Sequence, residues 1–470
     1  MTIGRIALVA AAGLLALHPA GSAGQTVEEL QRQIDELRAL VESLRGAQQQ
    51  KLPELAESPK QEEATARIAG AAMSAEAQQE QDSAPRRKPW YERLALRGYT
   101  QLRNSEILSG DKTAPDRQSR LRSVQDRGIG DGNNFTFRRI RLAFSGDLNE
   151  HLSFYLQPEF AGSVSNQSNG ERRDGFAQLR DAYVDLHLGA DREWKIRFGQ
   201  SKIPFGWENL QSSSKRLTLD RSDAISSGTV GERDIGIIAY YTPGAAAEIW
   251  DRLSRDGQKL FGNYGVAGFG IFNGQGINRT EKNDNLMQVG MLTWPFALDG
   301  LGDALAGQVL ELGLSAYRNS FRPEVRSGGV SETDFKDKRI GFHAILYPQP
   351  FGMQAEWNWG RGPEFDPLAQ EIATRSLNGG YVQTMYRVAD FPMGEFMPYG
   401  RWQRYRGGWK AGTNAPRLET DELELGVEWQ PWKALELTIA YAHMKRREAD
   451  ERRLGRAEGD LIRTQLQWNY

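Results

Sequence analysis

Basic side chains recur in this sequence at a spacing that could place them together on one wall. Arg139 and Arg141 are two residues apart, and so are Lys195 and Arg197. Side chains two apart on a β-strand point to the same face, so each pair would present two cations side by side. Arg binds an anion through a planar fork and Lys as a compact charge. The chemistry that these residues could do is therefore the binding or guiding of anions.

Other basic residues belong to the same strand faces or to the polar stretch that follows residue 200. The anion-binding candidates are Arg97, Arg103, Arg139, Arg141, Lys195, Arg197, Lys202, Lys215, Arg216, Arg221 and Arg233. Two arrangements stay open: a ladder of cations along neighbouring walls, or a network neutralised by acidic residues such as Glu159, Asp181 and Asp185. Between residues 201 and 233 five basic residues stand against four acidic ones, so the charge of this stretch does not by itself specify an anion.

The elements that would position the candidates are strands with one apolar and one polar face. In residues 94–105, Leu94, Leu96 and Leu102 lie on one face, whereas Arg97 and Arg103 lie on the other. Such period-two alternation is typical of β-strands and recurs to the end of the chain. It predicts sixteen strands, at residues 94–105, 135–146, 152–160, 179–188, 194–199, 234–241, 264–272, 286–294, 309–320, 339–347, 351–360, 380–388, 397–406, 422–429, 435–444 and 461–470.

The connections between these strands alternate in length. Short links are expected at 348–350 and 431–433, and long ones at 104–134, 161–175 and 364–378. A transmembrane β-barrel has short turns at one end and long loops at the other. A soluble β-sandwich would show the same alternation along each strand. A barrel is favoured because aromatic residues such as Trp294, Trp402 and Trp429 lie near strand ends or on apolar faces, and because the last expected strand is apolar on alternate residues and ends in Tyr470.

The first 93 residues differ from the rest. An apolar run at 6–17 follows Arg5 and precedes small residues, which predicts a secretory signal peptide over 1–23; a buried helix is the alternative. Apolar residues spaced by three and four predict a short coiled coil over 24–50, although one amphipathic helix would have similar spacing. Residues 51–93 are expected to be a flexible linker, whose basic end before Trp90 could contact lipid head groups or simply be solvated.

Composition excludes several classes. The net charge is −2, mean hydropathy is −0.59 and cysteine is absent, so no disulfide framework or thiolate metal site is expected. Nothing after the signal peptide approaches the ~20 apolar residues of a spanning helix. The histidines outside the expected signal peptide lack the spacing of metal ligands. Ser212–Ser214 lacks the sequence context of a catalytic nucleophile, and no Gly-rich phosphate-binding loop precedes an expected helix. We therefore expect no enzyme, no metal or cofactor, and no nucleic-acid partner.

Four stretches carry a family resemblance. They are residues 137–146 (Phe-Arg-Arg-Ile-Arg-Leu, then Ser-Gly), 179–183 (Leu-Arg-Asp-Ala-Tyr), 197–206 (Arg-Phe-Gly-Gln-Ser-Lys-Ile-Pro-Phe-Gly) and 231–236 (Gly-Glu-Arg-Asp-Ile-Gly). In order and approximate spacing they resemble the phosphate-selective porin O and P family. The resemblance implies a sixteen-stranded trimeric outer-membrane barrel, a long third loop folded into the lumen at about 201–233, and basic side chains along a path for phosphate or polyphosphate. A periplasmic N-terminal coiled coil also occurs among such relatives.

Together these features predict an all-β chain: a 16-stranded antiparallel transmembrane β-barrel over 94–470, preceded by a short α-helical coiled coil. The expected function is passive diffusion of small anions such as phosphate across the outer membrane of a Gram-negative bacterium. The expected partners are outer-membrane lipid, two further copies in a homotrimer and the outer-membrane assembly machinery. The alternatives are a general or weakly selective porin, and a non-conducting barrel that acts as a tether.

Overall fold

The computed structural model describes residues 90–110, 121, 129, 135–165, 172–262, 264–449 and 455–470, all within the unit Lys88–Tyr470. The predicted signal peptide (1–23) and coiled coil (24–50) lie outside the described residues, as does the linker up to residue 89. The last four linker residues, which we expected to be flexible, form a short 3-10 helix, η1 (Trp90–Arg93).

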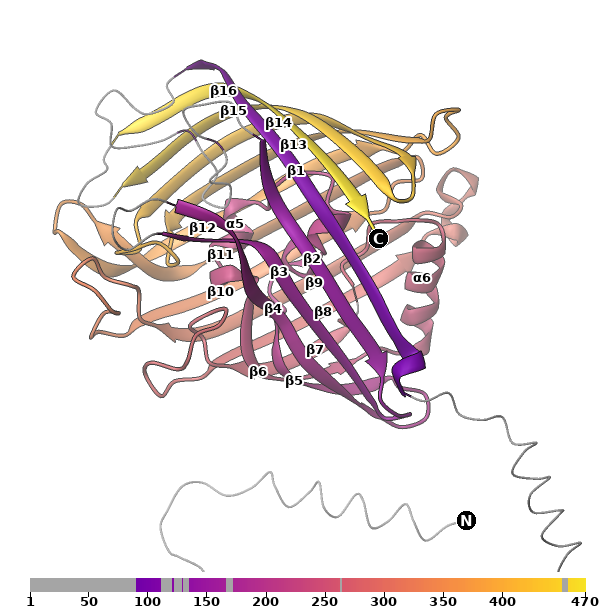
Figure 1. Ribbon diagram of the computed structural model, residues 1–470, viewed down its shortest axis with the longest axis horizontal. Helices are drawn as coiled ribbons and strands as arrows, with labels where there is room; N and C mark the ends of the chain where they lie inside the picture. Colours follow the sequence, from indigo (N-terminus) through magenta and orange to yellow (C-terminus); the bar gives the residue numbers. More distant parts are fainter. Residues whose placement is uncertain are drawn as a thin grey trace, which may run out of the picture. The chain divides into compact units, whose positions relative to one another are not determined.

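The described strands form one closed antiparallel barrel in which each strand pairs with its sequence neighbours and β1 pairs with β16 (Figure 1). This confirms the predicted sixteen-stranded barrel. The strands are β1 (Leu94–Gly110), β2 (Phe135–Asp147), β3 (Leu152–Ser165), β4 (Arg172–Leu188), β5 (Trp194–Lys202), β6 (Arg233–Tyr241), β7 (Ala267–Phe272), β8 (Met287–Ala297), β9 (Val309–Phe321), β10 (Phe335–Leu346), β11 (Phe351–Asp366), β12 (Glu371–Tyr386), β13 (Glu395–Gly408), β14 (Arg417–Trp432), β15 (Leu435–Ala449) and β16 (Arg456–Asn469).

Several strands run further than the alternation indicated, and the longest extensions lie at one end of the barrel. We call this the loop end, and the opposite end, where β1 begins, the turn end. The predicted long connection 364–378 was wrong, because β11 and β12 stay paired as far as Asp366 and Glu371. Beyond the apolar band the strands have polar residues on both faces, so the period-two signal fades while backbone pairing continues.

The barrel has polar side chains inside and apolar side chains outside. Along β9, Glu311, Ser315 and Asn319 are buried, whereas the intervening Leu314 is 49% exposed. The largest fully buried side chains include five arginines: Arg103, Arg197, Arg221, Arg233 and Arg463. This inverted pattern is typical of a barrel that faces lipid around a polar lumen. In the described part of the chain, no helix is long and apolar enough to cross a membrane.

The barrel closes where β1 meets β16. The backbone N–H of Gly98 donates to the carbonyl of Tyr470 at 2.6 Å, and the N–H of Tyr470 donates back at 2.9 Å. A Cβ added to Gly98 would lie 2.3 Å from the Tyr470 ring and 2.5 Å from the Arg141 carbonyl oxygen. Glycine at this position therefore allows the ring to lie against the first strand.

Gly98→Val should weaken this closure by about 1–3 kcal/mol, the usual cost of inserting carbon atoms where no space exists. Gly290→Val is the matched control, because the nearest atom to its added Cβ is 3.8 Å away. Unfolding of the refolded barrel by urea, followed by tryptophan fluorescence, measures both. Equal midpoints for the two variants would contradict the close contact.

Candidate functional site

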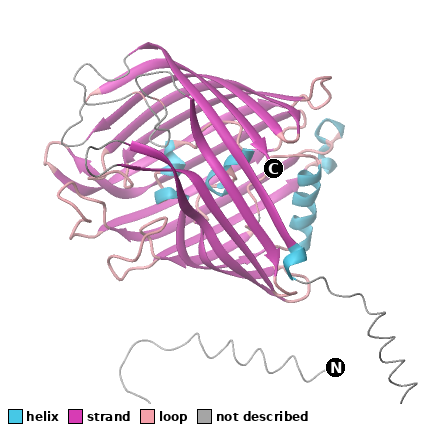
Figure 2. Ribbon diagram, in the orientation of Figure 1, coloured by secondary structure: helices cyan, strands magenta, loops and turns pink. Residues whose placement is uncertain are grey.

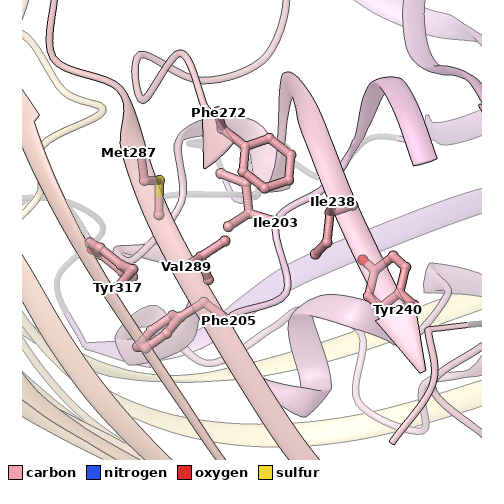
Figure 3. Packing of buried hydrophobic residues seen from close by; sticks show 8 residues of the cluster. All are labelled: Ile203, Phe205, Ile238, Tyr240, Phe272, Met287, Val289 and Tyr317. Atoms are coloured by element: carbon pink, nitrogen blue, oxygen red, sulfur yellow. The ribbon is translucent and has the colours of Figure 1, made fainter. Parts of the chain in front are cut away.

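The connection between β5 and β6, residues 203–232, lies inside the barrel; we call it L3. It contains α4 (Trp207–Leu210), η2 (Ser213–Lys215), α5 (Asp223–Ser226) and η3 (Val230–Glu232). Figure 2 shows short helices surrounded by the strands of the barrel. Its first residues pack on the lumen face of β6–β9, where Ile203 and Phe205 join Ile238, Val289 and Tyr317 (Figure 3). L3 is therefore fixed by an apolar contact as soon as it leaves β5.

A carboxylate of the barrel wall holds the beginning of α4. Glu356 of β11 accepts the backbone N–H groups of Trp207 and Glu208, both at 2.7 Å, and the hydroxyl of Tyr381 at 2.7 Å. Gly206 just before them has φ 83°, a backbone conformation that favours glycine. The turn and the carboxylate together direct L3 across the lumen.

Asp220 anchors the middle of L3 to the seam between the first and last strands. Its carboxylate binds Arg103 of β1 at 3.1 Å, Arg463 of β16 and Arg138 of β2 at 3.4 Å. Burial by itself raises the pKa of this carboxyl, but Arg103, Arg463 and Arg138 hold it well below its ordinary value. Asp220 therefore stays ionised and joins three strands through one group.

The remaining anchors lie on the other walls. Arg401 of β13 forms two bonds to Glu208, at 2.7 and 3.2 Å, and Arg446 of β15 binds Asp223. Lys410, in the connection between β13 and β14, donates to the carbonyl of Gly228 at 2.8 Å. Because L3 contacts the walls in several directions, it narrows the lumen at mid-height.

The structure divides the predicted anion-binding residues into two groups. In the first group each cation has a carboxylate partner: Arg103, Arg141, Lys195, Arg197, Arg221 and Arg233 pair with Asp220, Glu159, Asp185, Glu232 and Asp181. For these six the paired network, and not the open ladder, describes the arrangement. Their main effect is to hold L3 and the neighbouring strands together.

The second group has no carboxylate within ion-pair distance among the described residues. It contains Arg97, Arg139, Lys202, Lys215 and Arg216. Arg139 donates to the amide oxygen of Gln101 at 2.8 Å, and Lys202 donates to the carbonyls of Leu210 and Gln211. These five are the positive charges in the lumen that the described protein compensates least.

Arg216 is the most unusual member of this group. It lies on L3 with 6% of its surface exposed, and none of its three side-chain nitrogens has a hydrogen-bond partner among the described residues. Burial, and then the charge of Arg221, lowers the pKa of Arg216 to about 9, so the group is still cationic at neutral pH. Arg139 on β2 is close enough for the two charges to repel each other, while Glu208, Glu232 and Asp220 offset part of the charge of Arg216 without reaching ion-pair distance. The pair forms an under-compensated positive centre between L3 and the wall.

A second inward-folded segment was missed in the sequence. The connection between β6 and β7 contains α6 (Gly244–Arg255), followed by residues 256–262, which cross the turn end of the barrel beneath L3. Lys259 binds Glu428 of β14 at 2.7 Å and Glu436 of β15 at 3.2 Å, and its carbonyl accepts a bond from Gln211 of L3. Although burial opposes its charge, the two glutamates raise the pKa of Lys259.

Charge of the opposite sign gathers on the far wall. Glu422, Glu424 and Glu428 lie on the lumen face of β14 and are buried. An even number of residues separates them, as it does Arg139 and Arg141, so the sequence alone could have predicted that these three glutamates share a strand face. Glu422 lies 3.7 Å from Arg446 of β15, and Glu424 lies 3.8 Å from Arg463 of β16, so this acidic row is partly neutralised by the neighbouring strands.

A sixteen-stranded barrel with an inward-folded third loop and charged lumen walls defines the class of outer-membrane porins. The family model described as "Phosphate-selective porin O and P" matches residues 119–470, and the chain belongs to this family. An uncharacterized protein of Aquifex aeolicus (strain VF5) is 22% identical over an alignment 311 residues long, and the match covers 58% of this chain and 66% of that protein, just under two thirds of its length.

Solved structures resemble the chain at low identity. They include the outer-membrane channel DcaP of Acinetobacter baumannii (14% identity, 80% of this chain, 97% of that chain, TM-score 0.45). They also include a Salmonella typhi OmpF in complex with daunomycin (12%, 80%, 97%, TM-score 0.49) and an anion-selective porin from Comamonas acidovorans (12%, 80%, 99%, TM-score 0.46).

Asp220→Asn should loosen L3 from the seam, because three arginines lose their shared counter-charge. We expect a loss of about 3–5 kcal/mol, as for removal of one partner from a buried ion pair. Since the pKa of Asp220 is lowered, this stabilisation is present above about pH 4 and is lost as the pH falls further. Urea unfolding at pH 7 measures the loss. Asp390→Asn, at an exposed turn, is the control and should be neutral; equal effects would contradict the anchoring role.

Lys259→Gln should expose the negative charge of Glu428 and Glu436 at the turn end. We expect the zero-current potential in a KCl gradient to shift towards K⁺, because the mutation removes the only basic group that the described residues place on this glutamate pair. Lys433→Gln removes the same charge from an exposed turn at the same end and should cause a smaller shift. A shift that is equal in both variants would show that Lys259 is not inside the lumen.

Proposed function

We propose that this protein allows passive diffusion of small anions, phosphate among them, across the outer membrane through the constriction between L3 and the barrel wall. The observation that carries the proposal is the Arg216–Arg139 centre. A buried cation without a carboxylate partner is costly, and an anion beside it recovers much of that cost. The constriction thus favours anions over cations of similar size.

The geometry also supports passage in addition to binding. The five under-compensated cations lie on β1, β2, β5 and L3, so an anion meets successive positive groups and not one deep site. A series of moderate sites lets an ion enter and leave, whereas a single strong site traps it. Phosphate suits such a path because its oxygens accept bonds from several guanidinium and ammonium groups.

Two other functions are distinguishable from this one. A general porin would pass small solutes whatever their charge, and the acidic row on β14 would weaken any preference for anions. A barrel that acts only as a tether would conduct no ions. The predicted N-terminal coiled coil in the periplasm, the homotrimer, the outer-membrane lipid contacts and delivery by the assembly machinery belong to the same proposal.

Arg216→Gln should reduce anion selectivity, because it removes the least compensated charge at the constriction while keeping a polar side chain of similar length. The measurement is the zero-current potential of channels in a planar bilayer under a KCl gradient, followed by block of the chloride current by added phosphate. We expect wild-type channels to prefer Cl⁻ and to be blocked by phosphate, and the variant to lose about half or more of that preference.

Arg375→Gln is the matched control, since Arg375 is exposed near the loop end of β12 and pairs only with Asp366 among the described residues. It should leave the potential unchanged. Wild-type channels that prefer K⁺ would overturn the proposal, and the absence of any ohmic channel would favour the tether. Chloride preference without block by phosphate would leave an anion porin that does not recognise phosphate.

A further inference from the structure

A cavity of about 710 Å³ lies beneath L3 at the turn end of the lumen. Its walls combine aromatic rings with basic side chains. The rings are those of Tyr99, Tyr155, Tyr183, Phe261 and Tyr264, and the basic groups include Arg97, Arg141, Lys202, Lys215 and Arg233. Asp181 and Asp185 also line the cavity and pair with Arg233 and Arg197. Inorganic anions need no aromatic surface, and a volume of this order suits a small organic molecule.

Two of the tyrosines form a stacked pair. Tyr155 of β3 and Tyr183 of β4 are direct neighbours in the sheet, with ring centroids 5.3 Å apart and planes 17° apart. The guanidinium of Arg197 lies over Tyr183, 3.7 Å from the ring centre. Tyr183 is thus engaged by Tyr155 and by Arg197.

Tyr155 has space beside it. It stacks on Tyr183 towards β4, so its other face is turned towards β2, where its direct partner is Ser145. The next residue of β2 on the lumen face is Ala143, and both small side chains line the cavity. Because neither fills the volume beside the ring, the structure leaves a slot next to an aromatic face.

Two cations without carboxylate partners line the same cavity. Arg97 of β1 lies opposite Ala143 in the sheet, is exposed to the cavity and contacts the hydroxyl of Ser145 at 3.4 Å. Lys215 of L3 is exposed and lines the same cavity. Among the described residues neither cation has an ion pair, so both can bind a ligand carboxylate without breaking one.

We propose that this cavity is a binding site for organic anions that carry an aromatic ring, with the ring on the free face of Tyr155 and the carboxylate between Arg97 and Lys215. The site rests on the proposed anion channel and names a further class of solute for it. Offset stacking supplies the preference for a flat ring, and the two cations supply the preference for negative charge.

The test compares potassium benzoate with potassium cyclohexanecarboxylate, which has a similar size and the same charge but no aromatic face. Each is added to either side of single wild-type channels in a planar bilayer, and interruption of the chloride current is measured. We expect benzoate to block at a concentration about threefold to tenfold lower than cyclohexanecarboxylate, the range typical of one aromatic contact.

Four variants locate the site. Tyr155→Leu removes the ring and Ala143→Leu fills the slot, so both variants should abolish the benzoate preference. Tyr155→Phe keeps an aromatic ring and should keep the preference. Arg97→Gln should weaken block by both anions to the same extent. Channel conductance in KCl checks that each variant folds, and Ala143→Leu decides the matter if Tyr155→Leu does not insert.

The two proposals fail separately. Equal block by the two acids in wild-type channels that still prefer chloride would overturn the aromatic site and leave the anion channel standing. Retention of the benzoate preference in Ala143→Leu would also overturn the site. Wild-type channels that show no preference for chloride would instead contradict the proposed anion channel, on which the aromatic site rests.

Discussion

The structure depends on the pairing of charges inside the barrel. A lumen narrowed by protein screens charges less than open water does, so an isolated buried ion is costly and an ion pair persists only with good geometry. Asp220 meets this constraint by joining Arg103, Arg138 and Arg463. Since those arginines come from strands at the barrel seam, the same contacts that neutralise charge also hold L3 across the pore.

In the proposed function, anions are attracted by the basic side chains that have no carboxylate partner. Most predicted basic residues are used to hold the constriction in place, and their charges are cancelled locally. Arg216 and Arg139 are different, because neither has a carboxylate within ion-pair distance among the described residues, and no nitrogen of the Arg216 guanidinium has a hydrogen-bond partner there. The acidic row on β14 is partly neutralised by Lys259, Arg446 and Arg463. Selectivity in this account comes from the placement of a few charges within a chain whose net charge is only −2.

The strands were predictable because alternation is a local property, and each of the sixteen predicted segments overlaps a strand of the barrel. Their extensions at the loop end were not, since polar residues on both faces erase the alternation there. The helix α6 was overlooked although Ala246, Ile249, Trp250 and Leu253 have helical spacing. The pairing of Asp220 with Arg463 could not be predicted, because 243 residues separate them and only barrel closure brings them together.

The central claim is that an anion occupies the constriction beside Arg216 and Arg139. Crystals of the protein soaked in bromide, with anomalous diffraction measured at the bromine edge, test it most directly. We expect L3 to lie within the barrel and an anomalous peak to contact the Arg216 guanidinium. A lumen without a peak at this position, or an L3 that lies outside the barrel, would contradict it.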